Sequence, residues 1–153
     1  MQITTATATT NEVGKLTDIV NAYSETHGRL AAAGASTPED WAPWAEFVDV
    51  AAFKRVGAYL EELNWDQYLE FNSQWADGTK FEMTVFHITE VGNTVFQEIE
   101  ERHYRDDTFI RKNVIAVYRF NENNKIVHLD IYEQAKDSGQ WIIKAAQEAM
   151  EQA

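Results

Sequence analysis

All four histidines of this chain fall at positions where hydrophobic patterning predicts an inward-facing side chain. They are His27, His87, His103 and His128. Two acidic residues, Glu101 and Asp130, fall on the same predicted inward faces. Histidine titrates near neutral pH, so it can both accept and donate protons. Because buried ionisable groups cost free energy unless they are paired, this cluster predicts a polar pocket suited to general acid–base catalysis.

Within this cluster we expect Asp130 to be the base, oriented or assisted by His128. Burial disfavours the charged form of a carboxylate, so an inward Asp130 should have a raised pKa that suits a base near neutral pH. His87 or His103 would supply the acid. A second group is expected to complete the pocket: Glu101 as a further acid, Tyr23 or Tyr132 as the group that holds a substrate oxygen, and His27, Ile99, Val114 and Tyr118 as further lining residues.

Two other interpretations of these residues stay open. A single inward histidine is more often a hydrogen-bonded structural residue than a catalytic one. Histidines and acids could also bind a metal, although no HxH or HExxH spacing is present; ligands can assemble from different strands. We expect no metal and no cofactor. The aromatic residues are expected in the core, although some could line a pocket for an aromatic ligand: Trp41, Trp44, Tyr59, Trp65, Phe71 and Trp75.

The pattern along the chain predicts helices first and a sheet afterwards. A possible capping box at Thr9 and Glu12 starts a helix near residue 10 that ends at Gly34. Further elements are expected as follows: a short helix after Pro38, a strand at 52–56, a helix at 65–75, strands at 80–89, 94–104, 110–120 and 125–134, and a final helix at 140–151. This order predicts one α+β domain over residues 1–153, with residues 1–10 disordered.

Short turns at 90–93, 105–109 and 121–124 predict that the four long strands form an antiparallel meander. Strict alternation then places the inward residues in layers. We expect the first layer to be His87, Gln97, Tyr118 and His128, the second Val85, Ile99, Ala116 and Asp130, the third Met83, Glu101, Val114 and Tyr132, and the last Phe81, His103 and Lys112. Asp130 and Glu101 would be two strands apart, ~10 Å by strand spacing.

Three segments of the sheet half resemble a known superfamily. They are Phe86-His87-Ile88, Val95-Phe96-Gln97-Glu98 and Lys125-Ile126-Val127-His128-Leu129-Asp130-Ile131-Tyr132. With the layout of residues 12–134, they are similar to the nuclear transport factor two-like, or SnoaL-like, superfamily. The resemblance implies a cone-shaped curved antiparallel sheet packed against N-terminal helices around an internal pocket. Fold alone does not settle function, because this superfamily hosts several chemistries and non-catalytic binders.

The resemblance also implies roles for individual residues. It places the catalytic aspartate of the superfamily's epoxide hydrolases at Asp130 and their second acid at Glu101. The arginine between these acids corresponds to Ile99, which counts against that mechanism. The resemblance to dehydratases implies that His87 and His103 occupy the places of two sheet histidines, while Tyr23 and His27 stand in for a tyrosine–aspartate pair. It further implies a homodimer through an apolar sheet face made of Phe96, Ile115, Val117 and Leu129.

Composition excludes other classes of protein. The chain has 153 residues and a formal net charge of -12, which disfavours nucleic acid and anionic membrane surfaces as partners. It has no cysteine, which excludes thiolate chemistry and disulfides. The start of the chain lacks the pattern of a secretory signal, and no apolar run is long enough for a membrane span. We expect a soluble, cytoplasmic protein.

Together these observations predict a small cofactor-independent enzyme of the lyase or dehydratase type. Its substrate would be a hydrophobic, aromatic or cyclic small molecule. An epoxide hydrolase-like hydrolase, with Asp130 activating water, is the alternative enzyme. A non-catalytic ligand-binding or dimerisation module is the alternative of a different class.

Overall fold

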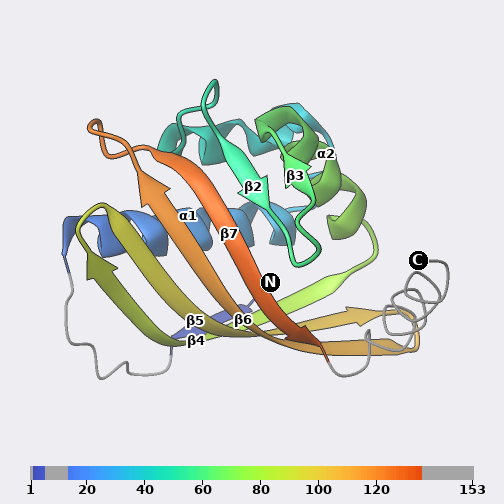
Figure 1. The fold of residues 1–153 in the computed structure, drawn as a ribbon. Helices are drawn as coiled ribbons and strands as arrows, with labels where there is room; N and C mark the ends of the chain where they lie inside the picture. The colour runs from blue at the N-terminus through green and yellow to red at the C-terminus, as the bar shows by residue number, and fades with distance from the viewer. Residues whose placement is uncertain (1, 6–13, 136–153) are drawn as a thin grey trace, which may run out of the picture.

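A curved seven-stranded sheet with the helices on its concave side forms this domain (Figure 1). The structure is a computed structural model that describes residues 2–5 and 14–135. The strand order is β1-β4-β5-β6-β7-β2-β3. The pairs β4–β5, β5–β6 and β6–β7 are antiparallel, whereas β1–β4 and β2–β7 are parallel. The expected α+β class, with a central antiparallel meander, is confirmed.

The strands fall close to the expected ranges, with two additions at the edges. Their bounds are β1 Gln2–Thr5, β2 Lys54–Val56, β3 Glu62–Leu63, β4 Lys80–Val91, β5 Thr94–Arg105, β6 Thr108–Phe120 and β7 Ile126–Ala135. Disorder was expected over residues 1–10, but the structure places Gln2–Thr5 in a strand beside β4. The expected final helix at 140–151 and the capping box at Thr9 lie outside the described residues.

Within the described residues, three helical segments cover the concave side of the sheet: α1 Lys15–Ala32, a 3-10 helix η1 Pro38–Phe47, and α2 Trp65–Ala76. The side chain of Asn64 begins α2 by accepting from the backbone N–H of Gln67. The start of α1 is capped from the sheet instead. Oε1 of Glu90 accepts from the backbone N–H groups of Leu16 and Thr17 at 2.7 and 3.0 Å, which fixes α1 against the end of β4.

Aromatic and aliphatic side chains fill the space between the helices and the sheet. Trp41 and Trp44 of η1 are buried, and the indole N–H of Trp41 donates to the Ser73 hydroxyl of α2 at 3.0 Å. Val20 and Tyr23 of α1 reach the same core from the other side. A smaller apolar cluster of Met83, Val85, Ile99 and Val114 lies on the sheet itself. The core does not fill the polar end of the concave face, and the candidate site lies there. No helix among the described residues is long and apolar enough to cross a membrane.

Two β-bulges change which residues point inward. In β4, Val85 pairs with Ile99 but His87 pairs with Glu98, so Phe86 is an extra residue. In β7, Ile126 pairs with Phe120 but His128 pairs with Arg119, so Val127 is an extra residue. A bulge reverses the alternation of side chains beyond it. The predicted inward placement of His87, His128, Asp130 and Tyr132 is therefore wrong.

The β5–β6 register also differs from the expected layers. The turn has only two residues between Arg105 and Thr108, with Asp106 at a φ of 51° that such a tight turn needs. We expected a five-residue loop. The shorter turn moves β6 by two residues, so Glu101 pairs with Lys112 and Ile99 with Val114. The expected pairings of β4 with β5 at Phe81–His103, Met83–Glu101 and Val85–Ile99 are confirmed.

Candidate active site

One cavity of about 390 Å³ opens between the helices and the concave face of the sheet. Its walls are largely aromatic, and their residues come from η1, α2 and β4: Trp41, Tyr68, Phe71, Trp75 and Phe81. Charged side chains from β2, β5, β6 and β7 enter the same space: Arg55, Glu101, His103, Lys112 and Glu133. An apolar cavity with a few convergent polar groups is the usual form of a small-molecule site.

Glu101 and His103, two residues apart on β5, form a hydrogen-bonded pair in this cavity. Nε2 of His103 lies 3.0 Å from Oε2 of Glu101. On the other side of the ring, the indole N–H of Trp75 donates to Nδ1 of His103 at 3.1 Å. Because an indole nitrogen can only donate, Nδ1 is the acceptor and the ring proton lies on Nε2. His103 therefore donates to Glu101.

The charge state of Glu101 follows from these neighbours. Burial opposes its negative charge and would raise its pKa. The hydrogen bond from His103 and the electrostatic interactions with His103, Lys112 and His27 act in the other direction and prevail, so the pKa of Glu101 is lowered from its ordinary value. Glu101 is consequently a carboxylate at neutral pH. Among the described residues, its second oxygen, Oε1, has no hydrogen-bond partner.

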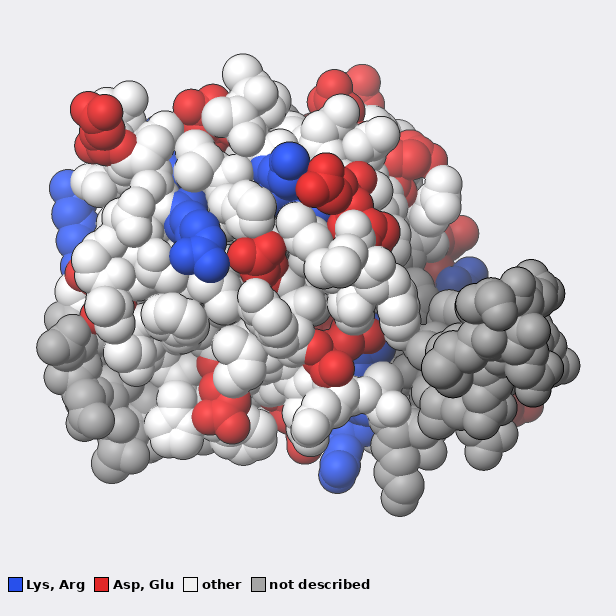
Figure 2. Space-filling model, viewed as in Figure 1, with Lys and Arg blue, Asp and Glu red and all other residues white. Residues whose placement is uncertain are grey.

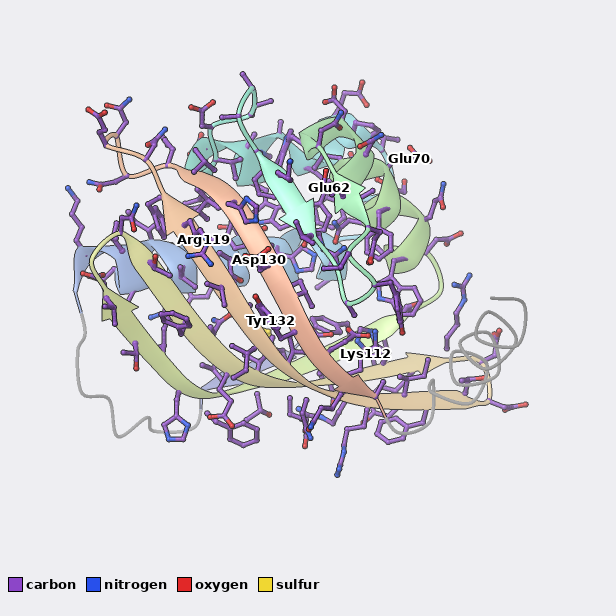
Figure 3. All side chains as sticks on the ribbon, viewed as in Figure 1. Glu62, Glu70, Lys112, Arg119, Asp130 and Tyr132 are labelled. Atoms are coloured by element: carbon purple, nitrogen blue, oxygen red, sulfur yellow. The ribbon has the colours of Figure 1, made fainter. Side chains whose placement is uncertain are left out.

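Lys112 and Glu133 form an ion pair beside Glu101. The Nζ atom of Lys112 lies 3.4 and 3.3 Å from the two carboxylate oxygens of Glu133. Lys112 is also the cross-strand partner of Glu101 on the same face of the sheet. Figure 3 labels Lys112, a residue of β6. The positive charge of Lys112 is thus paired with Glu133 and also lowers the pKa of Glu101.

His27 lies at the helical wall of the cavity. Its Nε2 is 2.9 Å from Oδ1 of Asn72, whose amide nitrogen donates to the Tyr68 carbonyl at 2.7 Å. This second bond fixes the amide, so Nε2 of His27 is the donor. The ring stacks on Trp41 with centroids 5.4 Å apart. Burial lowers the pKa of His27 despite the Asn72 bond, which keeps the ring neutral at neutral pH.

Arg55 of β2 reaches the cavity from the side opposite β5. Its guanidinium carbon lies 5.4 and 5.3 Å from the ring centroids of Tyr68 and Phe71 on α2. Nη1 is 3.6 Å from Oε1 of Glu61, while Nε is buried and has no hydrogen-bond partner among the described residues. Arginine over aromatic faces is a stabilising arrangement.

Four of the expected site residues lie on the outer, convex face instead. Nε2 of His128 is 2.8 Å from Oδ1 of Asp130, and Nη2 of Arg119 is 3.5 Å from Oδ2 of the same carboxylate. Figure 3 shows Asp130, Arg119 and Tyr132 on the face toward the viewer. His87 is exposed and pairs with Glu98 across the β4–β5 hairpin at 2.6 Å. Asp130 and Glu101 therefore lie on opposite faces of the sheet and not on the one inward face that we expected.

Four further predicted lining residues are inward but belong to the packed core. Tyr23 and Tyr118 pack edge to face with ring centroids 5.6 Å apart. Burial is the largest of the effects that raise the pKa of both hydroxyls. Ile99 and Val114 lie in the apolar cluster of the sheet. None of the four lines the cavity. Of the predicted site residues, only Glu101, His103 and His27 meet there.

Sequence reasoning missed several cavity residues for identifiable reasons. Lys112 was placed inward, but no role was assigned to it. Glu133 was not among the expected inward residues, because strict alternation does not include the bulge at Val127. The signal was available: Ile126 and Leu129 are both apolar and three residues apart, which strict alternation does not produce. Arg55 lies in the short apolar strand, and no role was predicted for it. For Asn72 we find no sequence signal.

The aromatic residues divided between the core and the cavity. Trp41, Phe71, Trp75 and Tyr59 line the cavity, which bears out the expectation that some of the aromatic residues would do so. Trp44 and Trp65 are core residues. Among the described residues, no three His, Asp or Glu side chains are grouped so that they could hold a metal ion.

Comparison with known proteins identifies the fold of this chain but not its chemistry. No family model and no curated protein sequence matches this chain. Solved structures do. BvnE pinacolase from Penicillium brevicompactum aligns with a TM-score of 0.63 at 14% identity, over 90% of this chain and 96% of that one. An LEH-like epoxide hydrolase from M. tuberculosis aligns at 0.60 and 13% identity, over 77% and 84%.

A third similar structure is an NTF2-like protein of unknown function from Exiguobacterium sp. 255-15. It aligns with a TM-score of 0.58 at 14% identity, over 73% of this chain and 98% of that one. Identities this low carry over the fold and not the activity. With its curved sheet, its helices on the concave side and the cavity between them, this chain has the fold of the nuclear transport factor two-like, or SnoaL-like, superfamily.

Proposed function

We propose that this protein is a cofactor-independent enzyme that transfers protons on a hydrophobic, aromatic or cyclic small molecule, with Glu101 as the base. One observation carries the proposal. Glu101 is held ionised at the wall of an aromatic cavity, with one oxygen bonded to His103 and the other unpartnered among the described residues. A carboxylate in that position can accept a proton from a bound substrate.

In this proposal His103 positions Glu101 and does not itself react. Trp75 occupies its Nδ1 lone pair and Glu101 accepts its Nε2 proton. The ring therefore has neither a free lone pair nor a free proton to offer the substrate. Its hydrogen bond orients the carboxylate and lowers the basicity of Oε2, which directs proton acceptance to Oε1.

In this proposal Lys112 is the general acid. Its ammonium group stands across the strand pair from Glu101 and is held by Glu133. In a dehydration, Glu101 would take the proton from carbon, and Lys112 would protonate the departing hydroxyl, so that an alkene and water leave. Return of the proton from Glu101 to Lys112 restores both groups. Glu133 would keep Lys112 in place between turnovers.

The cavity walls support the substrate class. Stacked and tilted aromatic side chains favour flat or cyclic apolar ligands. The volume of about 390 Å³ is within the usual range for small-molecule sites. Elimination and isomerisation both begin with proton removal by Glu101, so the first test addresses this shared step.

The experiment is hydrogen–deuterium exchange in D₂O. A panel of small cyclic and aromatic ketones and β-hydroxy carbonyl compounds is incubated with the protein, and NMR reports deuterium gained at carbon and water lost. We expect catalysed exchange with at least one compound, and a loss of ~10²–10⁴-fold in Glu101→Gln. Asp130→Asn is the matched control, because it makes the same change on the outer face and should keep the full rate.

Two results would contradict the proposal. Exchange at the normal rate in Glu101→Gln would mean that another group is the base. Tight binding of panel compounds with no exchange or elimination would favour the alternative, a non-catalytic ligand-binding module.

A further inference from the structure

Arg55 is a partly buried cation whose hydrogen-bonding capacity is not used. Its side chain is 12% exposed. The nearest acceptor, Oε1 of Glu61, is 3.6 Å from Nη1, which is longer than the 2.7–3.2 Å of an ordinary hydrogen bond. Nε has no partner among the described residues. A guanidinium carries five N–H donors, and leaving the buried Nε donor without a partner costs free energy.

The aromatic neighbours of Arg55 stabilise its face and leave its edge open. Tyr68 and Phe71 lie about the same distance from the guanidinium carbon, at 5.4 and 5.3 Å. The N–H groups lie in the guanidinium plane, so contacts with ring faces do not satisfy them. Arg55 also lines the cavity. An acceptor that enters the cavity can therefore meet the N–H edge.

Arg55 differs in this respect from the other cation of the cavity. Lys112 is already held by both carboxylate oxygens of Glu133 at 3.3–3.4 Å. Lys112 has one N–H donor left for the hydroxyl of the proposed dehydration, whereas the side chain of Arg55 makes no hydrogen bond among the described residues. Its fixed fork of N–H groups matches a planar carboxylate with two parallel hydrogen bonds.

We infer that Arg55 is the anchor for a carboxylate on the ligand of this cavity, so that the substrate is an aromatic or cyclic carboxylic acid. The inference rests on the proposed function for the identity of the cavity as the substrate site. It deepens that function by naming the substrate class. With the carboxylate on Arg55 at the β2–α2 side, the rest of the ligand extends over the aromatic walls toward Glu101 on β5.

The carboxylate of Glu61 competes with a ligand carboxylate for the guanidinium of Arg55. It is the only carboxylate within 4 Å of Arg55 among the described residues, and the side chain of Glu61 is 44% exposed. Its other oxygen, Oε2, accepts from the backbone N–H of Tyr59 at 2.9 Å. A ligand carboxylate must bind beside Glu61 or displace it, so the charge of Glu61 should weaken binding of anions. Changes at Arg55 and Glu61 should then act in opposite directions.

Calorimetric titration with two isosteric probes tests the inference. 2-Naphthoate and 2-naphthamide have nearly the same shape and differ in charge. We expect the wild-type protein to bind naphthoate about 10-fold tighter, as a charge-assisted pair implies. Arg55→Met should abolish this preference and leave naphthamide binding within about 3-fold. Glu61→Gln should tighten naphthoate by a few-fold. Arg119→Met, the same change on the outer face, should alter neither affinity.

Several outcomes would overturn the inference. Equal affinity for the two probes in the wild-type protein would do so, as would naphthoate failing to bind at millimolar concentration or a preference that survives in Arg55→Met. If Arg55→Met does not fold by circular dichroism, the wild-type comparison and Glu61→Gln still decide. Glu101→Gln should retain the preference for naphthoate, so loss of turnover there concerns the proposed function alone.

Discussion

Trp75 donates its indole N–H to Nδ1 of His103 across 3.1 Å, and this bond selects one tautomer of this cavity-lining histidine. The donor comes from α2 and the acceptor from β5, so packing of helix on sheet sets the position of the ring proton. The selected tautomer then donates to Glu101 at 3.0 Å. The hydrogen bonding of Glu101, the proposed base, therefore depends on a residue that a sequence pattern marks only as aromatic.

Trp75→Phe should release the tautomer of His103. The phenyl ring keeps much of the apolar volume but has no donor, so Nδ1 becomes free to carry the proton. ¹⁵N NMR of the imidazole should report a single Nε2–H tautomer in the wild-type protein and a mixture in Trp75→Phe. The lost hydrogen bond should lower the free energy of unfolding by about 0.5–1.5 kcal/mol. An unchanged single tautomer would show that Glu101 alone orients the ring.

The fold could be predicted from the sequence because its long strands alternate clearly and their turns are short. The site could be predicted only in part, for a local reason. An extra residue at Phe86 and another at Val127 reverse the alternation beyond them. The single extra residue in β7 turns Asp130 away from the cavity and turns Glu133 toward it. His103 and Glu101 lie on β5 away from both bulges, and their predicted placement was correct.

The partners of these residues could not be predicted, because they come from segments distant in the chain. Trp75 meets His103, and Asn72 meets His27, through the docking of α2 on the sheet and on α1. Helical periodicity indicates that a residue faces inward, but not which atom it contacts. Arg55 enters the cavity because β2 pairs in parallel with β7, a long-range pairing that no local pattern encodes.

The stability of the protein should depend on pH through Glu101. Its pKa in the folded state is below the ordinary glutamate value of about 4.3. A carboxylate with a lowered pKa stabilises the fold at pH values above its unfolded pKa, and this contribution is lost as pH falls through the folded pKa. The difference in free energy of unfolding between wild type and Glu101→Gln should be constant from pH 7 to 5 and shrink below about pH 4.3.

Urea titrations at each pH give this difference directly. Glu98→Gln is a suitable control, because Glu98 is an exposed carboxylate on the opposite face of the same strand. A wild-type advantage that grows as the pH is lowered would contradict the sign of the pKa shift at Glu101.

Asp130→Asn should have little effect on the cavity. From the sequence we expected this change to reduce turnover strongly, but the structure places Asp130 with Arg119 and His128 on the outer face. Partly exposed ion pairs contribute about 0–1 kcal/mol. We therefore expect a small loss of stability and unchanged affinity for 2-naphthoate by calorimetry. A large loss of binding or turnover would return Asp130 to the mechanism.

The homodimer stays a prediction, with a corrected surface. Leu129 belongs to the core, but Phe96, Ile115 and Tyr132 are on the convex face and are 42%, 38% and 60% exposed. Figure 2 shows uncharged surface there, interspersed with acidic and basic side chains. Light scattering should give a dimer at micromolar concentration, and Ile115→Glu should shift it to monomer. A wild-type monomer under these conditions would exclude assembly through this face.

Gly14 and Glu90 should behave as one unit in stabilising α1. A Cβ at position 14 would clash with Oε2 of Glu90, so a side chain there must displace the carboxylate that caps the helix. Glu90→Gln keeps the shape but removes the charge beside the helix N-terminus, and Glu90→Ala removes the cap, which should cost about 0.5–2 kcal/mol of unfolding free energy. Gly14→Ala should cost a similar amount.

The double variant separates this mechanism from a general intolerance of alanine at Gly14. If Gly14→Ala acts by displacing Glu90, adding Glu90→Ala should cost little more, because the cap is already lost and its space is now free. Urea denaturation of the two single variants and the double variant gives the interaction energy. Strict additivity would mean that Gly14 is needed for another reason. Binding of 2-naphthoate should be the same in all four proteins, because neither residue lines the cavity.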